Sequence, residues 1–185
     1  MKPGMLRYYL LTVIIIALNS IGLSQDYSPV DKSSAIKFSI KNFGLPVGGS
    51  FTGLQGTIHF NPAALPLCMF NLSVDANTVN TGMAARDNHL RKEDYFNVQK
   101  YPILNFVSKQ IKAGDKPGSY LLTGTFTIKG ISKQISLPFT VVPLNDGLLF
   151  SGECKLNRKD FKVGGSSLIL SDNLMVSLSI FAKKS

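Results

Sequence analysis

The sequence predicts an all-β protein, an eight-stranded antiparallel up-and-down barrel with one helix between the third and fourth strands, near the barrel mouth. Three observations support this fold class. Apolar and polar residues alternate along eight segments, as in strands with one buried and one solvated face. Glycine, proline and asparagine separate the segments, and several connections are short enough for antiparallel hairpins. Eight strands can close into a small barrel that leaves no exposed edge.

Length and composition fit one folded domain. The 185 residues are 44% hydrophobic and 17% charged, which excludes a disordered, charge-rich chain. The formal charge is +9. The basic residues do not cluster with aromatic residues in any segment, so we expect no nucleic-acid partner, and simple solvation explains the charge.

Residues 1–24 have the pattern of a secretory signal peptide. Lys2 and Arg7 precede an apolar run from Leu10 to Leu18, which is shorter than the roughly 20 residues that span a bilayer. Small residues favour cleavage after Ser24 or, alternatively, after Gly22. An uncleaved anchor is the competing interpretation. The expected location is therefore periplasmic or secreted.

A polar lead-in, residues 25–33, precedes the barrel domain, residues 34–185. Each predicted strand alternates in polarity and ends near a turn signal, as at Asn61-Pro62 and Lys116-Pro117-Gly118. The eight predicted strands are Ser34 to Lys41, Ser50 to Phe60, Leu67 to Asn77, Ile103 to Ile111, Ser119 to Lys129, Ile131 to Val142, Leu148 to Leu156 and Asn173 to Ala182.

The segment between Asn80 and Val98 loses the alternation and predicts a helix of two to three turns from Met83. Arg86 and His89 are three residues apart and share a face, while Asp87 and Arg91 are four apart and are placed to pair. Two roles are open for this polar cluster. Its side chains either meet the polar end of a ligand at the barrel mouth or fasten the helix over the opening through hydrogen bonds to strand ends.

A second polar cluster follows the seventh strand. We expect Phe161 to turn into the barrel while Arg158 or Asp160 ties the loop down, and a solvated turn is the alternative. Catalytic signatures such as G-x-S-x-G, H-E-x-x-H and C-x-x-C are absent from the sequence. His59 is out of phase with its apolar neighbours and should face outward. The histidines and carboxylates have no metal-ligand spacing, so we expect no metal.

The two cysteines, Cys68 and Cys154, each share the alternation phase of apolar neighbours and should point inward. Export permits a disulfide. The predicted strand order does not make their strands neighbours, which favours two buried thiols, and a bridge remains the alternative.

Taken together, these segments resemble the YceI-like family, lipocalin-like proteins described as polyisoprenoid-binding, from about Ser34 to Lys183. Each motif is weak alone, whereas their order and spacing are specific. The motifs are Gly49-Ser50-Phe51 with Gly56-Thr57-Ile58-His59-Phe60-Asn61-Pro62, Thr81-Gly82 with Arg86-Asp87-Asn88-His89-Leu90, Asp94-Tyr95-Phe96 with Tyr101-Pro102-Ile103-Leu104-Asn105-Phe106, Gly124 with Ile128-Lys129-Gly130 and Leu137-Pro138, and Arg158-Lys159-Asp160-Phe161. The family commonly has glycine where this chain has Lys162.

The resemblance implies an extended barrel that holds a long apolar lipid, such as an isoprenoid quinone, a polyprenyl lipid or a fatty amide, for storage or transport in the bacterial envelope. It implies no catalysis and no cofactor apart from the lipid ligand. Homodimers and contact with a membrane surface for loading are further expectations. The lumen candidates are the residues of the inward phase, for which ordinary core packing is the competing explanation: Phe70, Leu72, Phe106, Leu122, Phe126, Ile128, Phe139, Phe150 and Leu156.

Two other functions stay open at this point. One is a lipid-modifying enzyme that uses His89 with Asp87 or Asp94. The other is a structural or stress-related interaction protein whose barrel is packed solid by its own side chains. An internal cavity in the structure would favour the lipid-binding protein, whereas its absence would favour the solid barrel.

Overall fold

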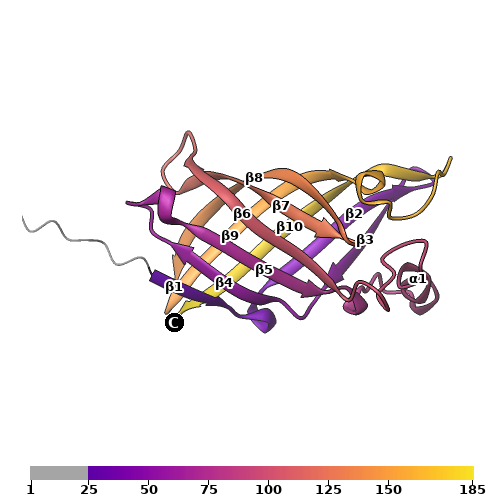
Figure 1. Cartoon of the computed structure of the whole chain (residues 1–185), viewed down its shortest axis with the longest axis horizontal. Coiled ribbons are helices and arrows are strands. Elements are labelled where there is room, and N and C mark those ends of the chain that lie inside the picture. The colour runs from indigo at the N-terminus through magenta and orange to yellow at the C-terminus, as the bar shows by residue number, and fades with distance from the viewer. Residues whose placement is uncertain (1–24) are drawn as a thin grey trace, which may run out of the picture.

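A computed structural model of the chain describes residues 25–185, which form one antiparallel sheet that closes on itself (Figure 1). The expected signal peptide and its cleavage position lie outside the described residues. One α-helix, α1 (Ala84–Leu90), and four 3-10 helices, η1 (Asp31–Ser33), η2 (Leu65–Leu67), η3 (Ala76–Thr78) and η4 (Arg158–Phe161), accompany the sheet. Within residues 25–185 no helix is both long and apolar enough to cross a bilayer. The strands are β1 (Gln25–Pro29), β2 (Ala35–Asn42), β3 (Leu45–Phe51), β4 (Gln55–Phe60), β5 (Met69–Asp75), β6 (Ile103–Ala113), β7 (Ser119–Ile128), β8 (Ile131–Leu144), β9 (Gly147–Asn157) and β10 (Leu170–Lys184).

Eight strands form the closed ring, in the order β1-β4-β5-β6-β7-β8-β9-β10. The C-terminal end of β10 closes it by pairing with β1, with Tyr27 opposite Lys184. The rest of β10 pairs with β2, and β2 pairs with β3. Consecutive β1 and β2 therefore act as one bent strand, and β3 and β4 act as the next. This confirms the predicted eight-stranded antiparallel barrel.

The two bends lie side by side and are tied together. The 3-10 turn η1 separates β1 from β2, and Gly53, with φ of 74°, lies between β3 and β4. The Asp31 carboxylate accepts a hydrogen bond from the backbone N–H of Leu54 at 2.8 Å. This contact fixes the angle at which the first two strands turn.

The expectation that the barrel strands begin at Ser34 is wrong, because one short strand, β1, precedes that residue. Part of the segment expected to be a lead-in forms β1, which pairs with β4 and β10 and buries Tyr27. The other four residues of β1 are polar or proline, so alternation alone gives almost no signal. Pro29 is tolerated because it ends the strand.

The barrel wall has a seam between β8 and β9, and Pro138 explains where it starts. Their ladder ends at the pair Phe139 and Gly152. The N–H of Val141 donates to Gly118 at 2.9 Å, on the β7 side, so the even-numbered residues of β8 face β9. To continue the ladder beyond Phe139, the residue at position 138 would have to donate its backbone N–H to β9, and proline has no N–H. Toward the helix end the two strands separate, and η4 contacts β8 there.

A second seam lies between β3 and β5. These strands are not neighbours in the sheet, and a single bridge between Ser50 and Asn80 links β3 to the segment after β5. Phe51 packs edge-to-face on Phe96 at 5.4 Å between ring centroids, which fills the gap with apolar contacts. Both seams therefore lie toward the end of the barrel that carries α1.

The predicted helix and hairpins are confirmed. The helix α1 has Met83 as its N-cap residue and lies at one end of the barrel, while the C-terminus lies at the other (Figure 1). Lys129 and Gly130 both have positive φ, as the two-residue turns of tight hairpins require. His59 lies on the outer phase of β4, as predicted, and contacts the carboxylate of Asp26 on β1.

Candidate functional site

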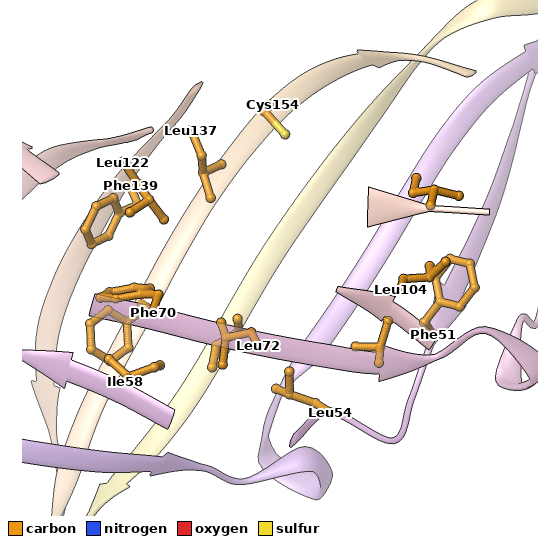
Figure 2. Packing of buried hydrophobic residues seen from close by; sticks show 14 of the residues in the cluster. Phe51, Leu54, Ile58, Phe70, Leu72, Leu104, Leu122, Leu137, Phe139 and Cys154 are labelled. Atoms are coloured by element: carbon orange, nitrogen blue, oxygen red, sulfur yellow. The ribbon is translucent and has the colours of Figure 1, made fainter. Parts of the chain in front are cut away.

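A cavity of about 640 Å³ lies inside the barrel, within the size range of ligand sites in proteins. It is lined mainly by apolar side chains that point inward from several strands, as Figure 2 shows for Phe70, Leu72 and Leu122. The interior is therefore not packed solid. The structure places every predicted lumen residue on this wall, although their contact with a lipid stays a prediction: Phe70, Leu72, Phe106, Leu122, Phe126, Ile128, Phe139, Phe150 and Leu156.

Aromatic rings close the cavity at the end that holds β1 and the C-terminus. Phe70 and Phe150 line the cavity and pack edge-to-face at 5.4 Å. Behind them Phe60 contacts Phe150 at 5.5 Å and Tyr120 at 5.3 Å, and neither Phe60 nor Tyr120 belongs to the cavity wall. Such edge-to-face contacts favour fixed ring positions. The lumen is thus a blind tube with an aromatic floor.

The opposite end is bordered by α1, whose polar side chains reach the cavity. Arg86 donates from Nε to the Thr81 hydroxyl at 2.7 Å and from Nη2 to the Thr81 carbonyl at 2.9 Å. Its Nη1 has no hydrogen-bond partner among the residues of the described barrel. His89 also lines the cavity and packs against the Tyr95 ring at 4.9 Å between centroids. Arg86 and His89 therefore share the mouth of the cavity, as their spacing predicts.

Asp87 has a structural role instead of a place in the cavity. Its buried carboxylate accepts hydrogen bonds from the hydroxyl and the backbone N–H of Thr81. The Thr81 hydroxyl, with further help from Arg91 and Arg86, lowers the pKa of Asp87 below its usual value although burial opposes the shift. The predicted pairing of Asp87 with Arg91 is wrong, because Arg91 donates to the carbonyls of Asn77 at 2.8 Å and Val79 at 3.0 Å.

Arg91 therefore fastens α1 to the segment that follows β5. Sequence spacing placed Arg91 within reach of Asp87 but gave no sign of the carbonyl acceptors, since these belong to the short turn η3 and to its C-cap residue Val79. Carbonyls at the end of a short 3-10 turn lack helical partners and suit the multiple donors of arginine. Arg91 thus has the fastening role weighed for this polar cluster, while contact of Arg86 and His89 with a ligand stays a prediction.

Arg158 ties down the loop after β9, as predicted, while Asp160 does not, since its side chain is exposed. The buried Arg158 guanidinium donates to the Asp172 carboxylate at 2.9 Å. It also donates to four backbone carbonyls, those of Val163, Gly165, Leu170 and Ser171.

Phe161 turns inward, also as predicted. It is 2% exposed, lines the cavity and packs against the Phe126 ring at 5.8 Å between centroids. Lys162 has φ of 52°, a left-handed conformation that glycine adopts most easily. The loop therefore keeps this conformation although the chain has lysine there.

The side chains named for the enzyme hypothesis are not joined to one another. Within residues 25–185 His89 makes no hydrogen bond or ion pair with Asp87 or Asp94, and Asp87 is already engaged by Thr81. Across the same residues, no three His, Cys, Asp or Glu side chains gather closely enough to hold a metal ion.

Both cysteines are buried free thiols, as the strand order favoured. Cys154 lies on the cavity wall, and burial raises the pKa of its thiol. Cys68 lies outside the cavity, where its Sγ contacts the backbone of Asn61. Burial also raises the pKa of Cys68, and the hydrogen bond to Asn61 partly offsets that shift.

Comparison with known proteins gives a consistent result. The YceI-like domain model matches residues 27–182. The chain is 27% identical over 171 residues to the UPF0312 protein ECA1782 of Pectobacterium atrosepticum, which covers 88% of each chain. It is similar in structure to BcnA of Burkholderia cenocepacia, with a TM-score of 0.79 and 24% identity over 84% of this chain and 99% of BcnA. A polyisoprenoid binding domain from Saccharophagus degradans, implicated in plant cell wall breakdown, has a TM-score of 0.68 and 17% identity over 86% of this chain and 98% of that domain.

Proposed function

Because the chain belongs to the YceI-like domain family, we propose that it binds a long apolar lipid in the barrel lumen and catalyses no reaction. The cavity of about 640 Å³, apolar, blind at one end and bordered by polar groups at the other, is the observation that carries this proposal. An isoprenoid quinone, a polyprenyl lipid or a fatty amide has the required chemistry, a long hydrocarbon chain with one small polar end.

Burial energetics explain why the ligand should be long. Each buried methylene contributes about 0.8 kcal/mol, so ten of them contribute roughly 8 kcal/mol. That gain corresponds to a Kd of about 1 µM, before the cost of association, which is about 4 to 15 kcal/mol. A short chain would not offset this cost. Because apolar burial is non-directional, the lumen should discriminate weakly between hydrocarbon chains of similar length.

The polar end of the lipid belongs beside α1. Arg86 keeps Nη1 available after its two bonds to Thr81, and His89 lies on the same border of the cavity. A carbonyl, hydroxyl or amide oxygen placed there would accept a hydrogen bond from the guanidinium. This orientation puts the hydrocarbon chain against the aromatic floor.

We place this activity in the bacterial envelope as part of the same proposal. The support is the signal-like pattern of residues 1–24, which lie outside the described residues. Storage of the lipid and its transport between membranes both fit a barrel that encloses its ligand.

The test compares two tryptophan variants on neighbouring positions of β9. Cys154→Trp places a large ring in the lumen, whereas Lys155→Trp places the same ring on the outer face. We expect organic extraction and mass spectrometry to find a long-chain lipid in the wild type and in Lys155→Trp, and to find it at least about tenfold depleted in Cys154→Trp. Circular dichroism and thermal unfolding check that both variants fold.

Two results would overturn the proposal. One is a wild-type protein that yields no lipid on extraction and takes up neither a polyprenol nor a quinone when these are added. The other is a folded Cys154→Trp variant that retains as much lipid as Lys155→Trp.

A further inference from the structure

Large apolar side chains stand in solvent at the open end of the barrel. Phe43 is 72% exposed, Leu45 69% and Leu168 fully exposed, and Ile169 beside them is 46% exposed. We call these four residues the mouth patch. Phe43 and Leu45 belong to the β2–β3 hairpin tip, and the other two belong to the loop before β10. The backbone N–H of Phe43 donates to the Ile169 carbonyl at 2.9 Å, which joins the two loops.

The mouth patch is continuous with the lumen. Ile169 lines the cavity together with Leu170, and so do residues of β2, the strand that pairs with Leu170. A contiguous exposed apolar patch on a soluble domain usually marks an interaction site. Here the patch borders the opening through which a ligand would pass.

The fold does not explain why Phe43 is a phenylalanine. Phe43 has φ of 52° and Gly44 has φ of 76°, the arrangement of a two-residue hairpin turn that favours asparagine, aspartate or glycine. A bulky aromatic residue with positive φ is strained, and this ring is not buried in the core. Strain at an exposed residue indicates that the side chain serves an interaction with another molecule and not the stability of the fold.

Lysines outnumber acidic residues in the segments around the mouth patch. The β2–β3 hairpin and the β7–β8 turn contain lysines and no acidic residue, and Asp160 is the one acidic residue in the loop from Lys159 to Ile169. Lys41 borders a shallow depression together with Leu168, Ile169 and one acidic residue, Asp172, which is paired with Arg158. Six lysines belong to these three segments, of which Lys159 lies 3.5 Å from the Asp172 carboxylate: Lys37, Lys41, Lys129, Lys133, Lys159 and Lys162.

We propose that this end of the barrel docks on an anionic lipid bilayer. The mouth patch enters the boundary between head groups and acyl chains, and the surrounding lysines contact the anionic head groups. Apolar tips surrounded by basic residues match that surface better than they match a protein partner, whose interface would need its own acidic ring. Docking would bring the lumen opening to the membrane, so that a lipid enters without crossing water. That last step rests on the proposed function, whereas docking itself does not.

Vesicle flotation tests the proposal. The protein is mixed with vesicles of phosphatidylcholine alone or of phosphatidylcholine with phosphatidylglycerol. The patch variant combines Phe43→Asn, which suits the turn, with Leu168→Ser. Val142→Ser removes an apolar side chain that is 54% exposed from the wall at the far end of β8 and serves as the control. Lys41→Gln with Lys162→Gln tests the charge.

We expect the wild type and Val142→Ser to float with anionic vesicles, and the patch variant to bind at least about tenfold more weakly. The lysine variant should lose affinity for anionic vesicles only, and added salt should weaken wild-type binding. Two results overturn the proposal: a wild type that binds neither vesicle, or a patch variant that binds as the wild type does. If the patch variant instead abolishes a dimer seen by sedimentation, while no vesicle binding occurs, the patch is a contact between copies and docking is wrong.

The two proposals fail separately. The Cys154→Trp variant, with its lumen filled, should still float with anionic vesicles. A wild type that carries lipid but does not float would refute docking and leave the lumen proposal standing. A wild type that floats but carries no lipid would refute the lumen proposal alone.

Discussion

Arg158 organises the loop that covers the seam between β8 and β9, and its removal should be costly. We predict that Arg158→Met lowers the free energy of unfolding by about 3 to 5 kcal/mol. Methionine keeps the unbranched stem and most of the volume, so the change isolates the guanidinium. The wild-type side chain is 5% exposed and makes five hydrogen bonds, four to carbonyls and one to Asp172.

The magnitude follows from which acceptors water can reach after the substitution. A hydrogen bond to a charged group contributes about 1.5 to 3 kcal/mol. Asp172 is 39% exposed and Gly165 is exposed, so water replaces the donor there at small cost. Val163 is buried and the 3.4 Å bond to Leu170 is long. The carbonyls of Val163 and Ser171 therefore lose their donor without a substitute, and about 1.5 to 2.5 kcal/mol for each gives the range above.

Urea unfolding of Arg158→Met and Lys159→Met supplies the measurement and its control. Lys159 is an exposed neighbour that approaches Asp172 at 3.5 Å, and an exposed pair of this kind contributes about 0 to 1 kcal/mol. Arg158→Lys should recover only part of the loss, because lysine lacks the planar fork. If Arg158→Met unfolds within about 1 kcal/mol of Lys159→Met, the reasoning is refuted.

Three further predictions follow from positions described above. Asp87 has a lowered pKa in the fold, so its stabilising effect should be present above its ordinary pKa of about 3.9 and be lost as the pH falls through the lower folded value. Unfolding of Asp87→Asn should therefore depend less on pH than that of the wild type in this acidic range, and equal slopes would contradict it. Gly56→Ala should cost more than about 2 kcal/mol, because φ is 129° and a Cβ would lie 2.0 Å from the Asn71 carbonyl oxygen. Gly165→Ala, where a Cβ meets nothing within 4 Å, should cost little, and equal melting temperatures would refute the argument. In a Cys68→Ser background, the Cys154 thiol should react slowly with a small alkylating reagent at neutral pH, faster as the pH rises, and more slowly once lipid is added, since its pKa is raised and it faces the lumen. Reaction at an unchanged rate after lipid loading would contradict that placement.

The alternation of apolar and polar residues along the strands made the barrel predictable. The features that were missed lie where this alternation is absent. The lumen residues were found because an inward phase of large apolar side chains repeats along long strands such as β9. The strand β1 escaped because one buried tyrosine among five residues makes no pattern. The division of the first two strands into four depends on bends held by Asp31 and Leu54, a contact between segments 23 residues apart.

Residue roles at the mouth were predictable only in part. The inward turn of Phe161 and the tie made by Arg158 follow from an aromatic residue beside charged ones. Spacing on a helix suggested a pair between Asp87 and Arg91, but helical spacing says nothing of Thr81 or of turn carbonyls that compete for the same groups. The effect of Pro138 also depends on which side of β8 faces β9, which only the pairing register decides.

The seams give the two ends of the tube different mechanical character. Around the aromatic floor an unbroken circle of backbone hydrogen bonds fixes the girth, since strand number and stagger set the diameter of a closed barrel. Near α1 the circumference is completed by side chains such as Phe161 instead. Widening at that end shifts side-chain packing and leaves the hydrogen bonds between strands intact. The same fold therefore accommodates ligands of unequal thickness at the entrance, while the diameter of the lumen around the end of the ligand stays constant.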